Sequence, residues 1–124
     1  MTNNLFIGKN SFICKSIFPS VRGKYISHKE IKDVNFKKYK NIFLLSSPKN
    51  YKKENIKNFI FEKKILNKIT NQRLIFFSTS KIYPNKLNCT ENIKPNPQSF
   101  YAENKLKAEK LFGKEIDKIL ILRL

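Results

Sequence analysis

The stretch RLIFFSTS (residues 73–80) carries four consecutive apolar side chains followed by three hydroxyl residues. A continuous apolar run, without alternating polar residues, is typical of a strand that is buried on both faces of a parallel sheet. The segments NNLFIG (3–8) and NIFLLSS (41–47) follow the same pattern and end in a glycine or in serines. These runs predict parallel strands with small or hydroxyl residues at their carboxyl ends, where such sheets bind ligands.

Two further apolar segments, KYISH (24–28) and KILILRL (118–124), are predicted as the remaining strands. Helical spacing of apolar residues predicts a helix over 11–18 and a longer helix within roughly 50–70. Strands that alternate with helices indicate the α/β class. We therefore expect a doubly wound parallel sheet of about five strands, with helices on both of its faces.

The first predicted strand runs into the turn GKNSFIC (8–14). In a dinucleotide-binding turn, three glycines permit the tight turn, the approach to the pyrophosphate and close helix packing. Only Gly8 is present here, and Ser11 and Cys14 stand at the other two positions. Serine and cysteine are the smallest replacements after alanine, so a crowded dinucleotide site and an ordinary strand–turn–helix connection both fit this turn.

The segment SFYAENKLKAEKLF (99–112) is predicted as a helix, with Asn96 and Pro97 suited to its N-cap and first position. Four of its side chains fall on one stripe at helical spacing, the stripe that packs on a sheet. The stripe consists of Tyr101, Lys105, Ala108 and Phe112. Lys105 is therefore the lysine of this helix that is expected to turn inward, where an ammonium group needs a partner.

The Tyr-x-x-x-Lys spacing carries little information by itself in so lysine-rich a chain. About one match is expected by chance, and a second match does occur at Tyr25 and Lys29. The inward stripe of the helix distinguishes Tyr101 and Lys105 from that second pair. A nearby ammonium favours the phenolate, so Lys105 is expected to lower the pKa of Tyr101 from its usual value of about 10.

Thr79, Tyr101 and Lys105, with the order of elements around them, resemble the extended short-chain dehydrogenase/reductase superfamily. In particular, they resemble the NAD-dependent epimerase/dehydratase family, which acts on nucleotide sugars. The similar segments are GKNSFIC, NIFLLSS, Asn58 before FIFEKKILNKI, LIFFSTSKIYPN, TENIKPNPQSFYAENKLKAEKLF and ILILRL. The resemblance implies that residues 1–124 form a single NAD(P)-binding Rossmann-like domain, truncated before the substrate-binding domain.

The resemblance also implies roles for individual residues. Tyr101 would be the general acid/base, Lys105 would bind the nicotinamide ribose and lower the Tyr101 pKa, and Thr79 would bind the reacting oxygen. The turn from Gly8 to Ile13 would hold the pyrophosphate. The expected cofactor-binding residues are Gly8, Asn10, Ser11, Phe12, Ile13, His28, Ser46 and Lys105.

The choice between NAD and NADP stays open from the sequence. The acid that often binds the ribose follows the second strand, and His28, Lys29 and Glu30 occupy that region. Lys29 is a candidate for contact with a 2′-phosphate.

The expected function is that of a nucleotide-sugar epimerase/dehydratase-type NAD(P)-dependent oxidoreductase, either active or as a truncated, inactive copy. The alternatives are a deoxysugar reductase of the dehydrorhamnose type, a non-catalytic Rossmann-like binding or assembly module and, after these, a nucleic-acid-binding protein.

Composition argues against several other classes of protein. The net charge is +17, but only Arg22, Arg73 and Arg123 are arginines, and arginine is the residue that base reading and bidentate phosphate contacts favour. We therefore expect no specific nucleic-acid partner. Cys14 and Cys89 make neither a disulfide framework nor a metal site, and no apolar stretch has the length of a membrane span. A cytoplasmic protein is expected, with a nucleotide-sugar substrate and a homo-oligomer or a completing partner chain.

Overall fold

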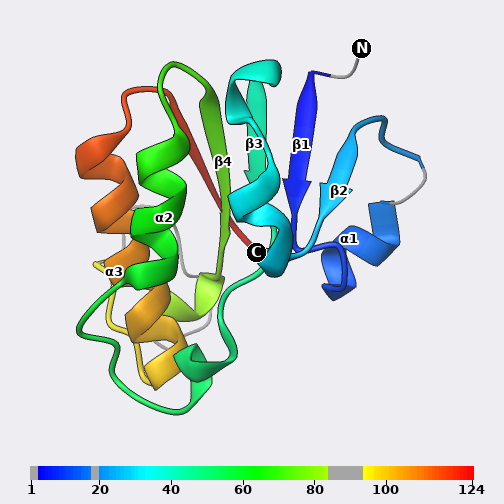
Figure 1. Ribbon diagram of the computed structural model, residues 1–124. Helices are drawn as coiled ribbons and strands as arrows, with labels where there is room; N and C mark the ends of the chain where they lie inside the picture. The colour runs from blue at the N-terminus through cyan, green and yellow to red at the C-terminus, as the bar shows by residue number, and fades with distance from the viewer. Residues whose placement is uncertain (1–2, 18–19, 84–93) are drawn as a thin grey trace.

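The computed structural model describes residues 3–17, 20–83 and 94–124. Their five strands form one parallel sheet in the order β2-β1-β3-β4-β5 (Figure 1). The strands are β1 (Asn4–Ile7), β2 (Lys24–Ile26), β3 (Asn41–Leu44), β4 (Arg73–Ser78) and β5 (Ile119–Arg123). The predicted α/β sheet of five strands is confirmed, and every strand lies within the segment that the sequence assigned to it.

The strand order places a topological switch point between β1 and β3. From β1 the chain crosses to β2 on one side, and from β2 it returns past β1 to β3 on the other side. In open parallel sheets a crevice forms at such a point, outside the carboxyl ends of the strands. The loops that follow β1 and β3 are therefore the place to look for a bound ligand.

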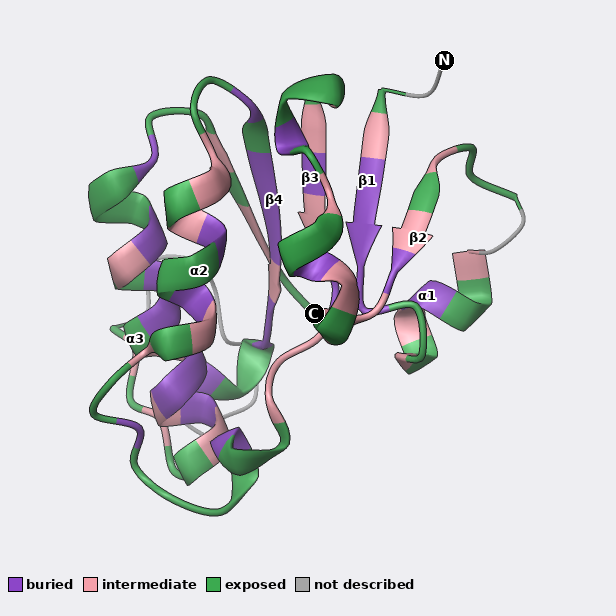
Figure 2. Ribbon diagram, viewed as in Figure 1, coloured by how far each residue is buried: buried purple, intermediate pink, exposed green. Residues whose placement is uncertain are grey.

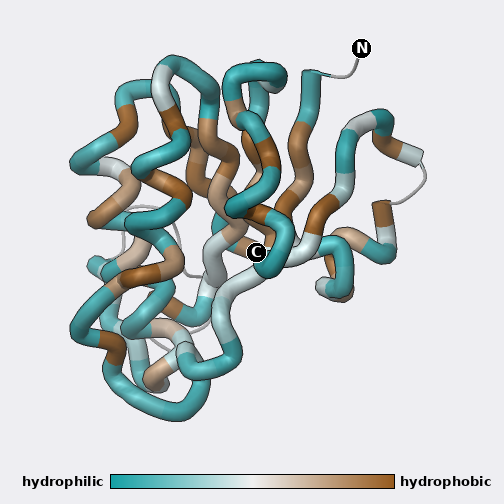
Figure 3. The backbone as a smooth tube through the Cα atoms, in the orientation of Figure 1, coloured by the Kyte–Doolittle hydropathy of each residue, from teal (hydrophilic) through white to brown (hydrophobic). Residues whose placement is uncertain are grey.

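Helices cover both faces of the sheet (Figures 1 and 2). The longer helices α2 (Ile60–Lys68) and α3 (Phe100–Glu115) pack on the larger core, whereas the short helix α1 (Phe12–Ile17) packs on the opposite face. Successive strand residues point to opposite faces, so Leu5 belongs to the larger core and Phe6 to the smaller one. Apolar residues follow the strands, and most outward helix positions are hydrophilic (Figure 3).

Four short 3-10 helices connect these elements. They are η1 (His28–Asp33), η2 (Phe36–Lys38), η3 (Lys49–Lys52) and η4 (Ser80–Ile82). The helix predicted within roughly 50–70 is confirmed as α2, but it begins only at Ile60, and the chain forms η3 before it. The predicted cap of α3 is wrong. Ser99 is the N-cap, and its side chain accepts the N–H of Ala102 at 3.1 Å, as serine commonly does at this position.

Among the residues that the structure describes, no helix is long and apolar enough to cross a membrane. Part of the predicted loop that leads into α3, including Thr90 and Glu91, lies outside the described residues, and so does Cys89. Cys14 is a buried free thiol.

Candidate functional site

The first part of the site is the turn that follows β1. Gly8 has a φ of 109°, a conformation that L side chains rarely adopt. The N–H groups of Gly8 and Lys9 both donate to the carbonyl oxygen of Ile26, at 2.8 and 3.0 Å. The turn is thereby fixed against the end of β2, and Gly8 is the residue that allows it.

Ser46, which follows β3, closes over this glycine. A Cβ atom at position 8 would lie 2.4 Å from the Ser46 Oγ atom. The same Oγ atom lies 2.7 Å from Nε2 of His28, the first residue of η1. Gly8, His28 and Ser46 therefore meet at the switch point, where the sequence predicted a cofactor site. The His28 ring lies 4.3 Å from the ring of Phe61, and burial lowers the pKa of His28.

Ser11 and Cys14 stand at the two positions where a dinucleotide-binding turn has glycines, and both make structural contacts. The Ser11 Oγ atom accepts the N–H of Cys14 at 3.2 Å and so caps the start of α1. Cys14 is buried and packs with Phe6 and Leu45, which lets α1 lie close to the sheet. Burial raises the pKa of the Cys14 thiol.

The turn also presents unpaired backbone donors. Within the described part of the chain, the N–H groups of Asn10, Phe12 and Ile13 donate to no protein acceptor. The Phe12 side chain is 85% exposed, so this residue contributes its backbone N–H group to the turn rather than a packed side chain. Adjacent unpaired N–H groups beside a glycine turn are suited to phosphate oxygens, which fits the predicted pyrophosphate contact.

The second part of the site lies at the end of β4. Lys105 of α3 is 2% exposed, and its Nζ atom donates to the carbonyl oxygen of Phe77 at 2.7 Å. The predicted inward stripe of α3 is confirmed, because Ala108 and Phe112 are buried too. Burial lowers the pKa of Lys105 to about 8, although the charges of buried carboxylates oppose that effect.

Tyr101 lies beside Lys105, with its ring centroid 5.7 Å from the Lys105 Nζ atom. The expected lowering of the Tyr101 pKa is corrected by the structure, since burial raises that pKa. The physical reason is that burial removes the phenol from water, which disfavours its charged form, while the Lys105 ammonium donates to the Phe77 carbonyl oxygen.

Thr79 follows β4 directly, two residues after Phe77. It is buried, and its Oγ1 atom accepts the N–H of Lys81 at 3.2 Å, which caps η4. Lys105 and Thr79 are thus both held at the carboxyl end of β4. The predicted catalytic residues gather at the end of β4, and most of the predicted cofactor residues gather at the ends of β1, β2 and β3.

Sequence reasoning missed a buried acid near this site. Glu62 of α2 is buried, and Tyr51 donates a short hydrogen bond to its Oε2 atom. Burial raises the pKa of Glu62, and the hydrogen bond from Tyr51 opposes that rise. Beside them, Asn104 is fully buried and binds backbone atoms at Tyr51, Glu54 and Ile56. No periodicity identifies these residues, because they are brought together by an irregular loop.

A second missed cluster joins α3 to the ends of β4 and β5. The Ser78 hydroxyl donates to the Glu109 Oε2 atom at 2.5 Å. The Arg123 guanidinium forms an ion pair with the Glu109 Oε1 atom at 2.6 Å. Arg123 also donates to the Tyr83 hydroxyl at 2.6 Å. One signal was available: Glu109 follows Lys105 by four residues and so falls on the same helix face.

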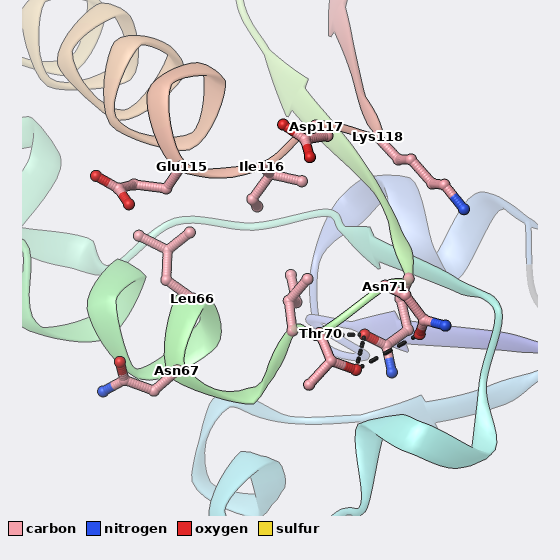
Figure 4. Close-up of a pocket in the computed structure, with 10 residues that line it drawn as sticks. Leu66, Asn67, Thr70, Asn71, Glu115, Ile116, Asp117 and Lys118 are labelled. Atoms are coloured by element: carbon pink, nitrogen blue, oxygen red, sulfur yellow. Dashed lines mark hydrogen bonds between the residues drawn. The ribbon is translucent and has the colours of Figure 1, made fainter.

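A separate cavity lies at the opposite end of the sheet (Figure 4). It is lined by residues that follow α2, among them Thr70 and Gln72, and by residues between α3 and β5, among them Glu115 and Asp117. The Thr70 N–H donates to the Gln72 Oε1 atom at 2.8 Å. None of the predicted site residues lines this cavity, and it faces the amino ends of β4 and β5 rather than the carboxyl ends.

No protein-family model and no curated protein matches the sequence. A dTDP-4-dehydrorhamnose reductase from Clostridium acetobutylicum matches with a TM-score of 0.75 at 21% identity, over 97% of this chain and 52% of its own. A dTDP-4-dehydrorhamnose reductase from Bacillus anthracis in complex with NADP matches with a TM-score of 0.74 at 15% identity, over 99% and 53%. A UDP-glucuronic acid 4-epimerase from Bacillus cereus in complex with NAD matches with a TM-score of 0.69 at 18% identity, over 97% and 55%. This chain therefore spans about half the length of these structures and has the fold of the part that it covers.

Proposed function

We propose that this chain is the cofactor-binding part of an NAD(P)-dependent oxidoreductase that acts on nucleotide sugars, of the epimerase/dehydratase or dehydrorhamnose reductase type. The strongest support is the buried Lys105 ammonium, which lies at the end of β4 beside Tyr101 and two residues from Thr79. A buried charged group is costly to keep, and such groups cluster at functional sites.

The turn after β1 fits a dinucleotide. Gly8 leaves a space that a Cβ atom would fill, and the unpaired N–H groups of Asn10, Phe12 and Ile13 supply donors for the pyrophosphate oxygens. Ser46 and His28 would border the adenosine side of the same crevice. The nicotinamide, when bound, supplies the hydride acceptor or donor.

The protein side chains would handle the proton. Tyr101 would exchange a proton with a sugar hydroxyl or carbonyl oxygen, and Thr79 would orient that oxygen by a hydrogen bond. Burial raises the Tyr101 pKa and so favours the protonated phenol, the form that donates a proton to a carbonyl oxygen. Lys105 would contact the ribose of the cofactor and hold positive charge near the phenol.

The similar structures support the ligand class. One of those reductases was solved with NADP and the epimerase with NAD, and their names state nucleotide-sugar substrates. Since this chain spans about half of their length, the proposal assigns to it the cofactor and the acid/base residues. The remaining substrate contacts, the homo-oligomer or completing partner chain, and the cytoplasmic location stay predictions.

The direct test is binding of the four nicotinamide dinucleotides to the purified chain by calorimetry, up to millimolar concentration. We expect at least one of NAD⁺, NADH, NADP⁺ and NADPH to bind. A Ser46→Phe variant, which fills the crevice beside Gly8, should lose that binding, whereas Lys107→Gln on the exposed side of α3 should keep it. Absence of binding by all four dinucleotides contradicts the proposed function.

A further inference from the structure

The strand β5 lies at one edge of the sheet, and in the described part of the chain only β4 pairs with it. The carbonyl oxygens of Lys118 and Leu124, at its two ends, accept backbone N–H groups from the β4 segment at 2.9 and 2.7 Å. Backbone groups of successive strand residues point to opposite sides, so the even-numbered residues of β5 bond to β4. The odd-numbered residues direct their N–H and carbonyl groups away from the sheet. They are Ile119, Ile121 and Arg123.

This outer edge is apolar and open to solvent. Edge strands commonly carry lysine or proline, which discourage pairing with another chain. Here residues 119–122 are all apolar, although the chain has 26 lysine and arginine residues. Ile119 and Ile121 pack against the larger core, so Leu120 points to the opposite face of the sheet, where it is 47% exposed. Such an edge is a template for one more strand.

The charges around β5 make the segment complementary to itself in the antiparallel direction. Asp117 precedes the apolar residues and Arg123 follows them. An antiparallel pair centred on Leu120 places Asp117 of each copy opposite Arg123 of the other copy, and Lys118 opposite an apolar residue. The Arg123 side chain pairs with Glu109 but is still 34% exposed, so a second carboxylate can approach it. No two like charges lie directly opposite each other in this register.

The same register matches the backbone groups that face away from the sheet. Centring on Leu120 pairs Ile119 of each copy with Ile121 of the other copy. Both residues direct their backbone groups outward, and each such antiparallel pair exchanges two hydrogen bonds. The two Leu120 residues then form a non-hydrogen-bonded pair, whose side chains lie closest together. The exposed leucine of one copy is thereby covered by that of the other.

We propose that β5 pairs antiparallel with β5 of a second copy of this chain, centred on Leu120, so that the two sheets join into one. This inference gives the predicted homo-oligomer a surface, and it does not depend on a bound dinucleotide. The switch point between β1 and β3 is separated from this edge by β4, so the crevice stays open. The net charge of +17 on each copy opposes association. The interface is also short, so the dimer is weak and tightens when salt screens the repulsion.

The first test is the mass of the purified chain by sedimentation equilibrium, from micromolar to millimolar concentration, in low and in high salt. We expect the weight-average mass to rise toward twice that of one chain, and to do so at lower protein concentration in high salt. A chain that stays monomeric at millimolar concentration in high salt overturns the proposal. Association that weakens in high salt is driven by charge rather than by this apolar edge, and it also overturns the proposal.

Variants with matched controls locate the surface. Leu120→Lys places two ammonium groups opposite each other at the centre of the pair and should raise the dimer dissociation constant at least about tenfold. Ile60→Lys makes the same change at a position of α2 that is 63% exposed and should have no such effect. Asp117→Lys should weaken the dimer about threefold to tenfold, because it faces Arg123, whereas Glu115→Lys should change it little. Thermal denaturation checks that each variant is folded. A dimer that is unchanged in both Leu120→Lys and Asp117→Lys overturns the proposed surface.

Cysteine crosslinking tests the register. The background is Cys89→Ser, in which the remaining Cys14 is a buried thiol. Leu120→Cys should give a disulfide-linked dimer with diamide as the oxidant, because Cα atoms of a non-hydrogen-bonded pair lie about 4.5 Å apart. Leu122→Cys should stay unlinked, because its two copies lie four residues out of register, about 13 Å along the strands. Crosslinking of Leu122→Cys without crosslinking of Leu120→Cys overturns the pairing centred on Leu120.

Discussion

The Lys105 Nζ atom donates a 2.7 Å hydrogen bond to the carbonyl oxygen of Phe77. This bond ties α3 to β4 two residues before Thr79, so the ammonium group is positioned by the backbone of the sheet. The charge is almost fully removed from water, and Glu109 and Glu62 oppose the resulting loss of proton affinity. The fold therefore maintains a destabilising charge at the end of β4.

Replacement of Lys105 should show how much the buried ammonium lowers the free energy of unfolding, because this effect depends on pH. Burial lowers the pKa of Lys105 to about 8 in the folded chain, whereas the unfolded value is about 10.4. Between these values the unfolded chain binds more protons, so this group makes the folded state more stable as the pH rises. Below pH 8 the penalty is complete, on the order of 3 kcal/mol. The free energy of unfolding of the native chain, minus that of Lys105→Met, should therefore rise between about pH 8 and pH 10.5.

Urea denaturation at several pH values measures this difference. Lys107→Met is the matched control, since Lys107 is exposed on the same helix, and its difference from the native chain should stay flat. A flat difference for Lys105→Met as well means that the ammonium is solvated rather than buried.

The turn at Gly8 provides a second test with an internal control. Alanine at position 8 must adopt a φ of 109° and place its Cβ atom 2.4 Å from the Ser46 Oγ atom. We expect Gly8→Ala to lower the free energy of unfolding by about 1–3 kcal/mol. Gly113→Ala in α3 meets no atom within 4 Å and should raise stability by about 0.5 kcal/mol.

The Gly8 expectation has a steric part that can be removed separately. Ser46→Gly in the Gly8→Ala background removes the clashing hydroxyl but not the unfavourable φ, so stability should return only in part. Full recovery would mean that the backbone at position 8 relaxes freely.

The sheet and helix α3 could be predicted from sequence because their signals are local. A buried parallel strand requires a continuous apolar run, and 73–80 supplies one. The inward face of α3 follows from helical spacing, which placed Lys105 inside correctly. The 3-10 segments, including η1 and η3, could not be predicted, because three- to six-residue turns have no periodicity long enough to detect.

The buried polar contacts were missed for a different reason. Glu109 meets Arg123 from another element, and Tyr51 meets Glu62 across a loop. Such pairs depend on tertiary packing, which sequence spacing does not report. The same limit explains the wrong direction for the Tyr101 pKa: spacing placed Lys105 near the phenol, but it did not report the burial of the phenol that raises this pKa.

The Glu109–Arg123 pair should be strongly asymmetric on mutation. Glu109 is buried, whereas the Arg123 side chain is 34% exposed. Removing the arginine leaves a buried carboxylate without its counter-charge, so Arg123→Gln should cost about 3 kcal/mol. Glu109→Gln keeps one oxygen as an acceptor and leaves an arginine that water can reach, so it should cost about 1–2 kcal/mol.

Thermal and urea denaturation of the two single variants and the double variant give the coupling energy between these residues. Glu115→Gln, exposed at the end of α3, is the control and should lie within about 0.5 kcal/mol of the native chain. Equal costs for both single variants, at the control level, contradict a structural role for the pair.

Two tyrosines near the site should respond in opposite ways to loss of the hydroxyl group. Tyr51→Phe removes the donor to the buried Glu62 carboxyl and should lower stability by about 1–3 kcal/mol.

Tyr101→Phe removes a hydroxyl from a half-buried ring and should change stability little, since the ring still packs against the core. If the protein turns over a nucleotide sugar, Tyr101→Phe should reduce kcat by at least about a hundredfold, the contribution of a general acid/base. Denaturation and steady-state kinetics on both variants separate the two roles. Turnover retained in Tyr101→Phe would mean that Tyr101 takes no part in the chemistry. Unchanged stability in Tyr51→Phe would mean that the Glu62 carboxyl does not depend on the Tyr51 hydroxyl.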